Sequence, residues 1–150
     1  MRLVIQRVAF ATVKVDGEIK GEIGKGLMIL VGVENGDRRE DAEWLAAKAA
    51  KMRIFPDEDG VMNKSVIDAG GDILAISQFT LTASTAKGNR PSYIRAAKGE
   101  EAKNLYEYFC SRIEKEIGKN VERGIFGADM KVELLNDGPV TIIIDSRLRE

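Results

Sequence analysis

The sequence predicts an α+β fold, in which a largely antiparallel sheet curls into a barrel-like or two-sheet core with two main helices. Strand patterns outnumber helical patterns, most neighbouring strands are joined by short turns, and two long segments have helical periodicity. The length of 150 residues suits a single domain spanning 1–150. Because 31% of the residues are charged and only 3 are proline, the composition is that of a globular protein.

The first third of the chain is expected to form antiparallel strands, beginning with the apolar residues Leu3, Ile5 and Val8. Apolar and polar residues alternate in Thr12–Val15 and again in Glu18–Ile23. The dipeptide between these segments, Asp16-Gly17, is typical of a hairpin turn. The following segment, Gly26–Val33, is continuously apolar, which indicates a central strand.

The first helix is predicted to begin at Asp37, because Asp37-Arg38-Arg39-Glu40 has the form of a capping box with Asp37 as the N-cap. The pattern ends before Phe55-Pro56, since the residue before a proline avoids helical geometry. Helical spacing gives the inward stripe Trp44, Leu45, Ala46, Ala49 and Met52.

A strand is predicted over Asp72–Gln78, and it runs into a polar, basic loop from Thr82 to Pro91. The second helix is predicted over Glu100–Ile117, with Gly118 as its stop. Its expected buried face consists of Ala102, Leu105, Phe109, Ile113 and Ile117.

The last two predicted strands, Met130–Leu135 and Val140–Asp145, are joined by Asn136-Asp137-Gly138-Pro139. Glycine before proline in a tight reversal is a setting where a cis peptide bond occurs. Pro139 cannot donate a hydrogen bond, so such a turn presents carbonyl groups on a fixed scaffold. The turn is either an ordinary hairpin or a rigid element that binds an ammonium group or excludes a side chain.

The chain contains no histidine, which rules out a Ser/His/Asp or Cys/His relay and removes the commonest zinc ligand. Gly24-Lys25-Gly26 is not a Walker loop, and no dinucleotide fingerprint is present. The acidic run Asp57–Gly60 lacks EF-hand spacing, so a solvated turn is favoured over a calcium site. Cys110 has no histidine to activate it and is expected to be a buried structural thiol. We therefore expect no metal and no cofactor.

The segment Ser77-Gln78-Phe79-Thr80 is a candidate site, because an apolar strand ends there in hydrogen-bonding side chains around an aromatic ring. Backbone N–H groups at such a strand end can hold an oxyanion without a side-chain base. Thr80 can orient a water or a substrate hydroxyl, but as a nucleophile it would need a base. The structural alternative is that Ser77 and Thr80 only finish a sheet edge.

Charge is unevenly distributed in a chain whose net charge is −1. No Asp or Glu occurs from Ile73 to Gly99, a stretch that contains Lys87, Arg90, Arg95 and Lys98. This locally positive segment suits a phosphate group better than a long duplex. The sequence also has no apolar run long enough for a membrane span and no signal-peptide segment, so a cytoplasmic protein without a membrane partner is expected.

Several short motifs lie in a fixed order along the chain: Gln6-Arg7-Val8, Gly26-Leu27, Arg53-Ile54-Phe55, Ser77–Leu81, Lys87–Ser92, Gly127–Met130 and Asn136–Thr141. Together they resemble the D-aminoacyl-tRNA deacylase family over essentially the whole chain. The resemblance implies a homodimeric hydrolase that cleaves the ester between a D-amino acid and tRNA and also removes glycine mischarged on tRNA.

The resemblance also implies site residues. A cis Gly138-Pro139 bond would enter the partner subunit's active site and reject L-amino acids there. The opposing pocket would be lined by Ser77, Gln78, Phe79 and Thr80, and the adenosine or aminoacyl site would be bounded by Phe126 and Met130. Two other interpretations remain: a non-catalytic module that binds an RNA end or a nucleotide, and a purely structural dimer.

Overall fold

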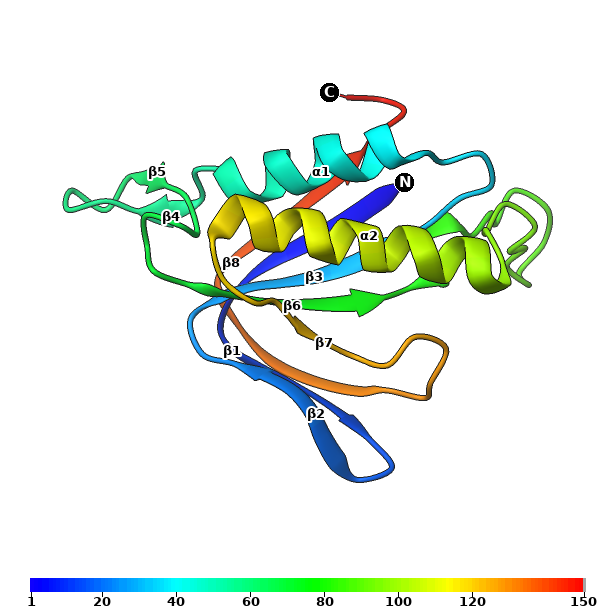
Figure 1. The fold of residues 1–150 in the computed structure, drawn as a ribbon, viewed down its shortest axis with the longest axis horizontal. Helices are drawn as coiled ribbons and strands as arrows, with labels where there is room; N and C mark the ends of the chain where they lie inside the picture. Colours follow the sequence, from blue (N-terminus) through cyan, green and yellow to red (C-terminus); the bar gives the residue numbers. More distant parts are fainter. Residues whose placement is uncertain (150) are drawn as a thin grey trace.

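One strongly curved sheet organises the molecule, and two helices cover one of its faces (Figure 1). The computed structural model describes residues 1–149. Its elements are β1 (Arg2–Val15), β2 (Glu18–Ile23), β3 (Gly26–Gly32), α1 (Arg39–Lys51), β4 (Phe55–Pro56), β5 (Met62–Lys64), β6 (Asp72–Ser77), the short 3-10 helix η1 (Phe79–Thr82), α2 (Gly99–Ile117), β7 (Glu122–Arg123) and β8 (Lys131–Asp145). The predicted α+β class is confirmed.

The strand order in the large sheet is β2-β1-β3-β6-β7, and β8 also pairs with β1. β1 is antiparallel to β2, β3 and β8, as predicted for a largely antiparallel sheet. The pairs β3–β6 and β6–β7 are parallel, which the sequence analysis did not foresee. They are parallel because α1 and α2 serve as the crossover connections, returning the chain to the same end of the sheet each time.

Two hydrophobic cores lie on opposite faces of the curved sheet. The core beneath the helices contains Leu27 and Ile29 of β3, whereas Met28 belongs to the smaller core inside the curve. β3 is therefore buried on both faces, which explains why its sequence is continuously apolar.

The predicted turn and the predicted second helix are confirmed. Asp16 and Gly17 both have positive φ angles, 51° and 79°, as a two-residue hairpin turn requires. α2 ends at Gly118, whose left-handed geometry lets its N–H donate to the Glu114 carbonyl at 2.9 Å. The predicted face of α2 is buried except for Ile117, which is half-buried. Cys110 lies in the same core, and burial raises the pKa of its thiol to about 11, so it is structural.

The predicted start of α1 is wrong by one residue. Arg38 is the N-cap, and its N–H donates to the Asp41 carboxylate at 2.8 Å. Asp37 instead accepts the Glu34 N–H at 2.7 Å and pairs with Arg147 at 2.9 Å, because these partners satisfy its buried charge. The buried stripe consists of Ala42, Leu45, Ala46, Ala49 and Ala50, while the predicted core residues Trp44 and Met52 are only half-buried.

The acidic run after α1 closes a small hairpin, β4–β5, that the sequence analysis did not predict. Asp57 accepts hydrogen bonds from the N–H groups of Asp59 at 2.9 Å and Val61 at 3.0 Å. Its carboxylate is therefore used by the turn itself, as expected for a solvated turn. Within residues 1–149, no helix has the length and apolar character needed to span a membrane.

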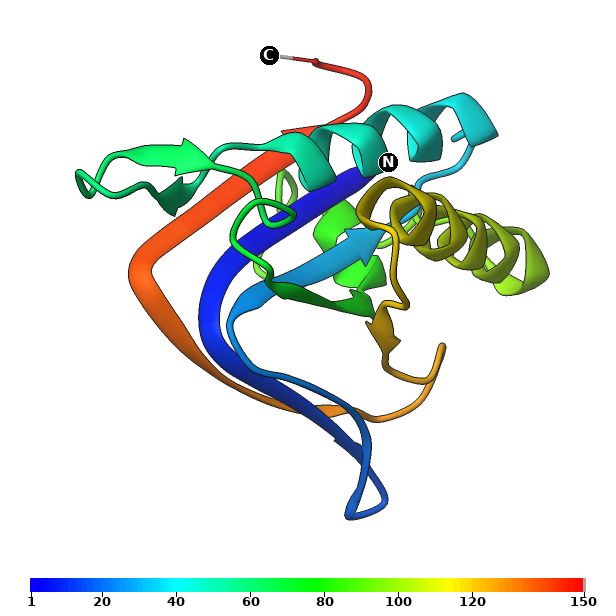
Figure 2. The ribbon, with the colours of Figure 1, turned by 60° about the vertical axis from the view of Figure 1, so that its left-hand side comes forward.

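The two predicted C-terminal strands are the halves of one strand, β8, so the predicted reversal at Gly138-Pro139 is wrong. Both halves run antiparallel to β1, with Lys131 opposite Lys14 at one end and Asp145 opposite Arg2 at the other. The chain bends between these halves and keeps its direction, because both pair with the same long strand (Figure 2). Met130 lies just before β8.

Candidate functional site

The segment Ser77–Thr80 lies where β6 leaves the sheet and η1 begins. The Gln78 N–H still donates to the Val31 carbonyl, at 2.8 Å. The next two N–H groups, those of Phe79 and Thr80, have no hydrogen-bond partner within residues 1–149, because they open a helical turn. The Gln78 side-chain amide donates to the Thr80 hydroxyl at 2.6 Å.

Two adjoining cavities lie on either side of Phe79, whose side chain is 56% exposed. The first, about 230 Å³, is lined by Ser77, Gln78, Phe79 and Met130 among others. The second, about 320 Å³, is lined by Phe79, Tyr93, Lys98 and Phe126 among others. The connection from β7 to β8 thus brings Phe126 and Met130 to the end of β6, and five predicted site residues share one region.

Thr80 lines neither of these cavities. It borders a third hollow of about 610 Å³, together with Leu81, Ile143 and Leu148 among others. Ile143 and Leu148 are each about two-thirds exposed, at 67% and 66%. Large apolar side chains gathered around an open hollow are characteristic of a contact surface.

An arginine and an aspartate fix η1 against the end of β8. Arg2 donates to the Leu81 carbonyl at 2.8 Å and to the Asp145 carboxylate at 2.9 Å. Burial opposes the charge on Asp145, but hydrogen bonds from the Arg147 N–H and from Arg2 hold its pKa below the ordinary value. These contacts of Arg2 position the backbone next to Thr80.

Gly138 and Pro139 occupy a bulge that projects from the sheet. Between the pairs Val8–Asn136 and Gln6–Thr141, β8 takes five residue steps and β1 takes two, so β8 carries three extra residues there. The Gly138-Pro139 bond is cis, as the resemblance implied. Gly138 has a φ of +135°, and a Cβ atom there would lie 3.0 Å from both Arg7 Nη2 and Val140 Cγ2, so glycine is required.

Arg7 holds this bulge, and the sequence analysis did not single it out as a site residue. Its Nε donates to the Asp137 carbonyl at 2.9 Å and its Nη1 to the Ile54 carbonyl at 2.6 Å. The residue is only 9% exposed. In the sequence, Arg7 stands out only as a cation among the apolar residues at the start of the chain. A cation on the exposed face of an edge strand gives the same sequence pattern.

The two halves of the predicted site are far apart within one chain. Ser77–Thr80 lie beside the Arg2 end of β1, whereas Gly138-Pro139 lie beside Arg7. Arg7 is five residue steps along β1 from Arg2, a distance of about 17 Å at roughly 3.4 Å per step. The two regions are at opposite sides of the molecule in Figure 1. A single chain does not bring them together.

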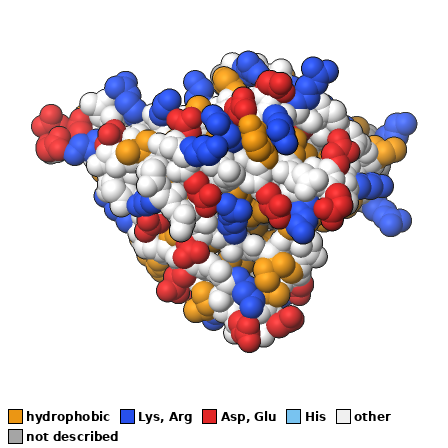
Figure 3. Space-filling model, viewed as in Figure 1, with side chains coloured by type: hydrophobic (Ala, Val, Ile, Leu, Met, Phe, Trp, Pro, Cys, Tyr) orange, Lys and Arg blue, Asp and Glu red, His pale blue; other side chains and the backbone are white. Residues whose placement is uncertain are grey.

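The basic segment divides into two groups. Arg95 is structural: it pairs with Glu34 at 3.3 Å and donates to the Thr82 carbonyl at 3.1 Å. Lys98 lines the cavity of Phe79 and Phe126. Lys87 and Arg90 are exposed on the loop that lies at the right-hand edge of Figure 3, where basic side chains project.

Comparison with known proteins gives one consistent result. Residues 4–145 match the family model described as D-Tyr-tRNA(Tyr) deacylase. The chain is 60% identical to the D-aminoacyl-tRNA deacylase of Parabacteroides distasonis and 55% identical to that of Dechloromonas aromatica, over 150 residues and 100% of each chain.

Solved structures show the same fold. A structure titled c-Myc DNA Unwinding Element Binding Protein superposes with a TM-score of 0.90 at 38% identity, covering 97% of this chain and 98% of its own. A structure of a probable eukaryotic D-amino acid tRNA deacylase has a TM-score of 0.80 at 17% identity, covering 95% and 97%.

The fold and these full-length matches define the class of the protein: it is a hydrolase. Within that class, the chain belongs to the D-Tyr-tRNA(Tyr) deacylase family.

The hydrogen bonds between Arg2 and Asp145 predict how the stability of the protein depends on pH. A carboxyl group whose pKa is lowered by folding stabilises the protein at pH values above the pKa it has in the unfolded chain. This contribution is lost as pH falls through the pKa of the group in the folded protein. We expect Asp145→Asn to lower the free energy of unfolding at pH 7 by about 1–2 kcal/mol, since a charge-assisted hydrogen bond is lost. The difference between wild type and variant should shrink as pH falls below the ordinary value of 3.8.

Urea unfolding followed by circular dichroism at pH 7, 5 and 3 measures this difference. The matched control is Asp59→Asn, which removes the same charge from an exposed turn. A constant difference between wild type and Asp145→Asn at all three pH values would show that ionisation of Asp145 does not stabilise the fold.

Proposed function

We propose that the protein hydrolyses the ester between a D-amino acid and the 3′-terminal adenosine of tRNA, releasing the D-amino acid and free tRNA, and that it also removes glycine mischarged on tRNA. Water adds to the ester carbonyl carbon, the bond to the ribose oxygen breaks, and that oxygen leaves with a proton. The observation that carries this proposal is the pair of cavities around Phe79 in a chain that matches deacylases over its full length.

Catalysis in this site rests on position and on backbone donors. Phe79 lines the first cavity, and its N–H and that of the next residue, Thr80, have no partner among the described residues, so they are suited to an oxyanion at the ester carbonyl. Thr80 accepts a hydrogen bond from the Gln78 amide, which is not a base, so its hydroxyl acts as an orienting group. The 2′-hydroxyl of the substrate's own ribose assists an ester that is already activated.

The aromatic cavity suits the terminal adenosine. Phe79 packs edge-on against Tyr93 with ring centroids 5.1 Å apart, and Phe126 lies on the same cavity. Rings of this kind stack on nucleic-acid bases. Lys98, immediately before α2, supplies a positive charge for a neighbouring phosphate. Met130 bounds the adjoining cavity, in which the aminoacyl group lies.

A second copy of the chain supplies the bend that selects chirality. Since about 17 Å of β1 separates Gly138-Pro139 from the pocket, the bend can enter a pocket only on another subunit. The same strand exposes Leu135 and Ile143 on either side of the bend, with exposed fractions of 54% and 67%. An interface that buries these side chains also buries the bend, which favours a homodimer.

Selection then occurs by exclusion. With an L-amino acid, the side chain points at the fixed backbone of the bend, and an unrelieved clash costs several kcal/mol, more than the roughly 1–3 kcal/mol gained from fitting one methylene group. D-side chains of many sizes point away from the bend. Glycine has no side chain to reject, so glycyl-tRNA is also a substrate.

The proposal predicts stereospecific release. Purified protein mixed with D-tyrosyl-tRNA should release D-tyrosine, and with L-tyrosyl-tRNA should release no tyrosine above the uncatalysed rate. Thin-layer separation of radiolabelled amino acid measures both. Tight binding of either tRNA without release would contradict the proposal and would identify a non-catalytic nucleotide-binding module.

The role of Thr80 is tested separately. We expect Thr80→Ala to retain measurable D-tyrosyl-tRNA hydrolysis with kcat lowered by about 10- to 100-fold, because an orienting hydrogen bond contributes about 1–3 kcal/mol. Thr82→Ala is the control, since the Thr82 hydroxyl donates to the Phe79 carbonyl at 2.8 Å and tests stability of the same turn. A Thr80→Ala protein that binds substrate and forms no product would identify Thr80 as the nucleophile.

Mixed dimers test whether the bend acts across the interface. Gly138→Ala, which meets Arg7 and Val140 at 3.0 Å, should disable the bend, and Phe79→Ala should disable the pocket. The Gly138→Ala homodimer should release both D- and L-tyrosine from their tRNAs, and the Phe79→Ala homodimer should be nearly inactive. A dimer of one chain of each kind has one intact site and should release D-tyrosine alone, with about half the wild-type kcat. Release of L-tyrosine by isolated mixed dimers would mean that bend and pocket act within one chain.

A further inference from the structure

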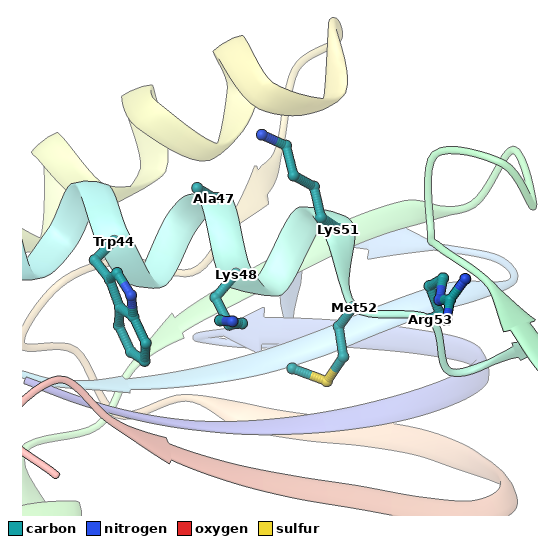
Figure 4. A pocket seen from close by; sticks show the side chains of 6 residues that line it. All are labelled: Trp44, Ala47, Lys48, Lys51, Met52 and Arg53. Carbon is teal, nitrogen blue, oxygen red and sulfur yellow. The ribbon is translucent and has the colours of Figure 1, made fainter. Parts of the chain in front are cut away.

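A groove along α1 is not accounted for by the proposed catalytic pocket. It encloses about 420 Å³ and is lined by Trp44, Ala47, Lys48, Lys51, Met52 and Arg53. Figure 4 shows Trp44, Lys48 and Met52 projecting from the same side of α1. Trp44, Lys48 and Met52 are spaced four residues apart, so they follow one side of the helix and its end.

The groove is positively charged. Lys48, Lys51 and Arg53 are exposed, and no acidic residue lines the groove. Lys51 pairs with Glu116 at 3.3 Å, whereas within residues 1–149 no carboxylate lies within ion-pair distance of Lys48 or Arg53. Among the described residues, the charge of these two cations is therefore not neutralised by a carboxylate.

The aromatic residue of the groove holds cations without neutralising them. Lys48 Nζ lies 5.6 Å from the centre of the Trp44 ring, and the Arg149 guanidinium lies 5.1 Å from it. A cation held by a ring keeps its full charge and its N–H donors, unlike a cation paired with a carboxylate. Trp44 thus presents positive charge around the groove.

Stability of the helix alone does not explain this arrangement. Cations near a helix C-terminus interact favourably with the helix dipole. This interaction explains the presence of Lys48 and Lys51 in the last turn. Arg53 lies beyond the end of α1 and gains nothing from that turn. Like charges that share one face also repel each other.

The groove is adjacent to the Gly138-Pro139 bend of the same chain. Arg53 precedes Ile54, whose carbonyl accepts a hydrogen bond from Arg7, and Arg7 also donates to the Asp137 carbonyl. In Figure 2 the bend of β8 lies at the left, on the side where α1 continues into β4. If the bend enters the partner's pocket, this groove is brought beside the partner's substrate.

We propose that the α1 groove binds backbone phosphates at the acceptor end of a tRNA whose aminoacyl group lies in the partner subunit's pocket. Lys48 and Arg53 donate to phosphate oxygens, and Trp44 orients Lys48. This inference rests on the proposed function. One subunit then supplies both the element that reads chirality and a surface that recognises the tRNA body.

The first test compares substrates of two sizes. In Lys48→Ala/Arg53→Ala, KM for D-tyrosyl-tRNA should rise about tenfold with kcat little changed, and the preference for whole tRNA over D-tyrosyl-adenosine should fall. The slope of log KM against log salt concentration should decrease by about 2, one for each lost phosphate contact. The matched control is Lys14→Ala/Lys115→Ala, which removes two exposed cations elsewhere.

The second test introduces the groove substitutions into one or the other chain of the mixed dimers. In a dimer of a Gly138→Ala chain and a Phe79→Ala chain, the one intact site takes its bend from the Phe79→Ala chain. The groove substitutions should raise KM when carried by that chain and should leave KM unchanged when carried by the Gly138→Ala chain.

The outcomes separate the inference from the proposed function. If wild-type protein fails to hydrolyse D-tyrosyl-tRNA, the proposed function fails and this inference with it. If wild type is active and Lys48→Ala/Arg53→Ala behaves like the control pair, or loses activity equally on both substrates, the groove does not bind tRNA and only the inference fails. An increase in KM from either chain of the mixed dimer would overturn the placement across the interface.

Discussion

The pairing of both halves of β8 with the single strand β1 determines where the functional parts of the molecule lie. β1 is long enough to pair with Lys131–Leu135 near its end and with Thr141–Asp145 near its start. The three extra residues of β8 must therefore leave the sheet between these halves, opposite Arg7. The same register fixes the distance between the bulge and the end of β6, and it makes a second subunit necessary if the two are to meet.

Two arginines on β1 hold η1 and the bulge of β8 in place. Arg2 and Arg7 are five residues apart, so their side chains lie on opposite faces of the strand. Arg2 connects η1 to β8 through the Leu81 carbonyl and Asp145, and Arg7 connects the bulge to the chain beyond α1 through the Ile54 carbonyl. Both donate to backbone carbonyls, so they position main chain, which suits a site whose proposed chemistry uses backbone groups.

The sequence predicts those features that local chemistry decides, and it fails where distant pairing decides. The Asp16-Gly17 turn, the apolar strand β3 and the Gly118 stop of α2 each follow from a few neighbouring residues. Asn136-Asp137-Gly138-Pro139 has the composition of a hairpin turn, and only the pairing of both flanks with β1 makes it a bulge.

The same limit applies to the candidate site. Ser77, Gln78 and Phe79 are neighbours in sequence, and family resemblance adds Phe126 and Met130, which the structure places at the adjoining cavities. Arg2 and Arg7 were not recognised, because a cation in a strand looks like a surface residue until its carbonyl partners are known. Asp37 was misassigned for a similar reason, since its partner Arg147 lies at the far end of the chain.

A site without a histidine depends on rigidity more than one built on a titrating base. If hydrolysis relies on two N–H groups and on the substrate's own hydroxyl, small displacements of η1 weaken both stabilisation and orientation. Asp145 restrains η1 through Arg2, and six residues earlier on the same strand Pro139 belongs to the bend. In the proposed dimer, each β8 therefore supports its own subunit's pocket and the selective wall of the other. Excluding an L-side chain by contact with backbone requires that the bend be held by the rest of β8. A bend that could move away from an L-side chain would no longer distinguish it from a D-side chain.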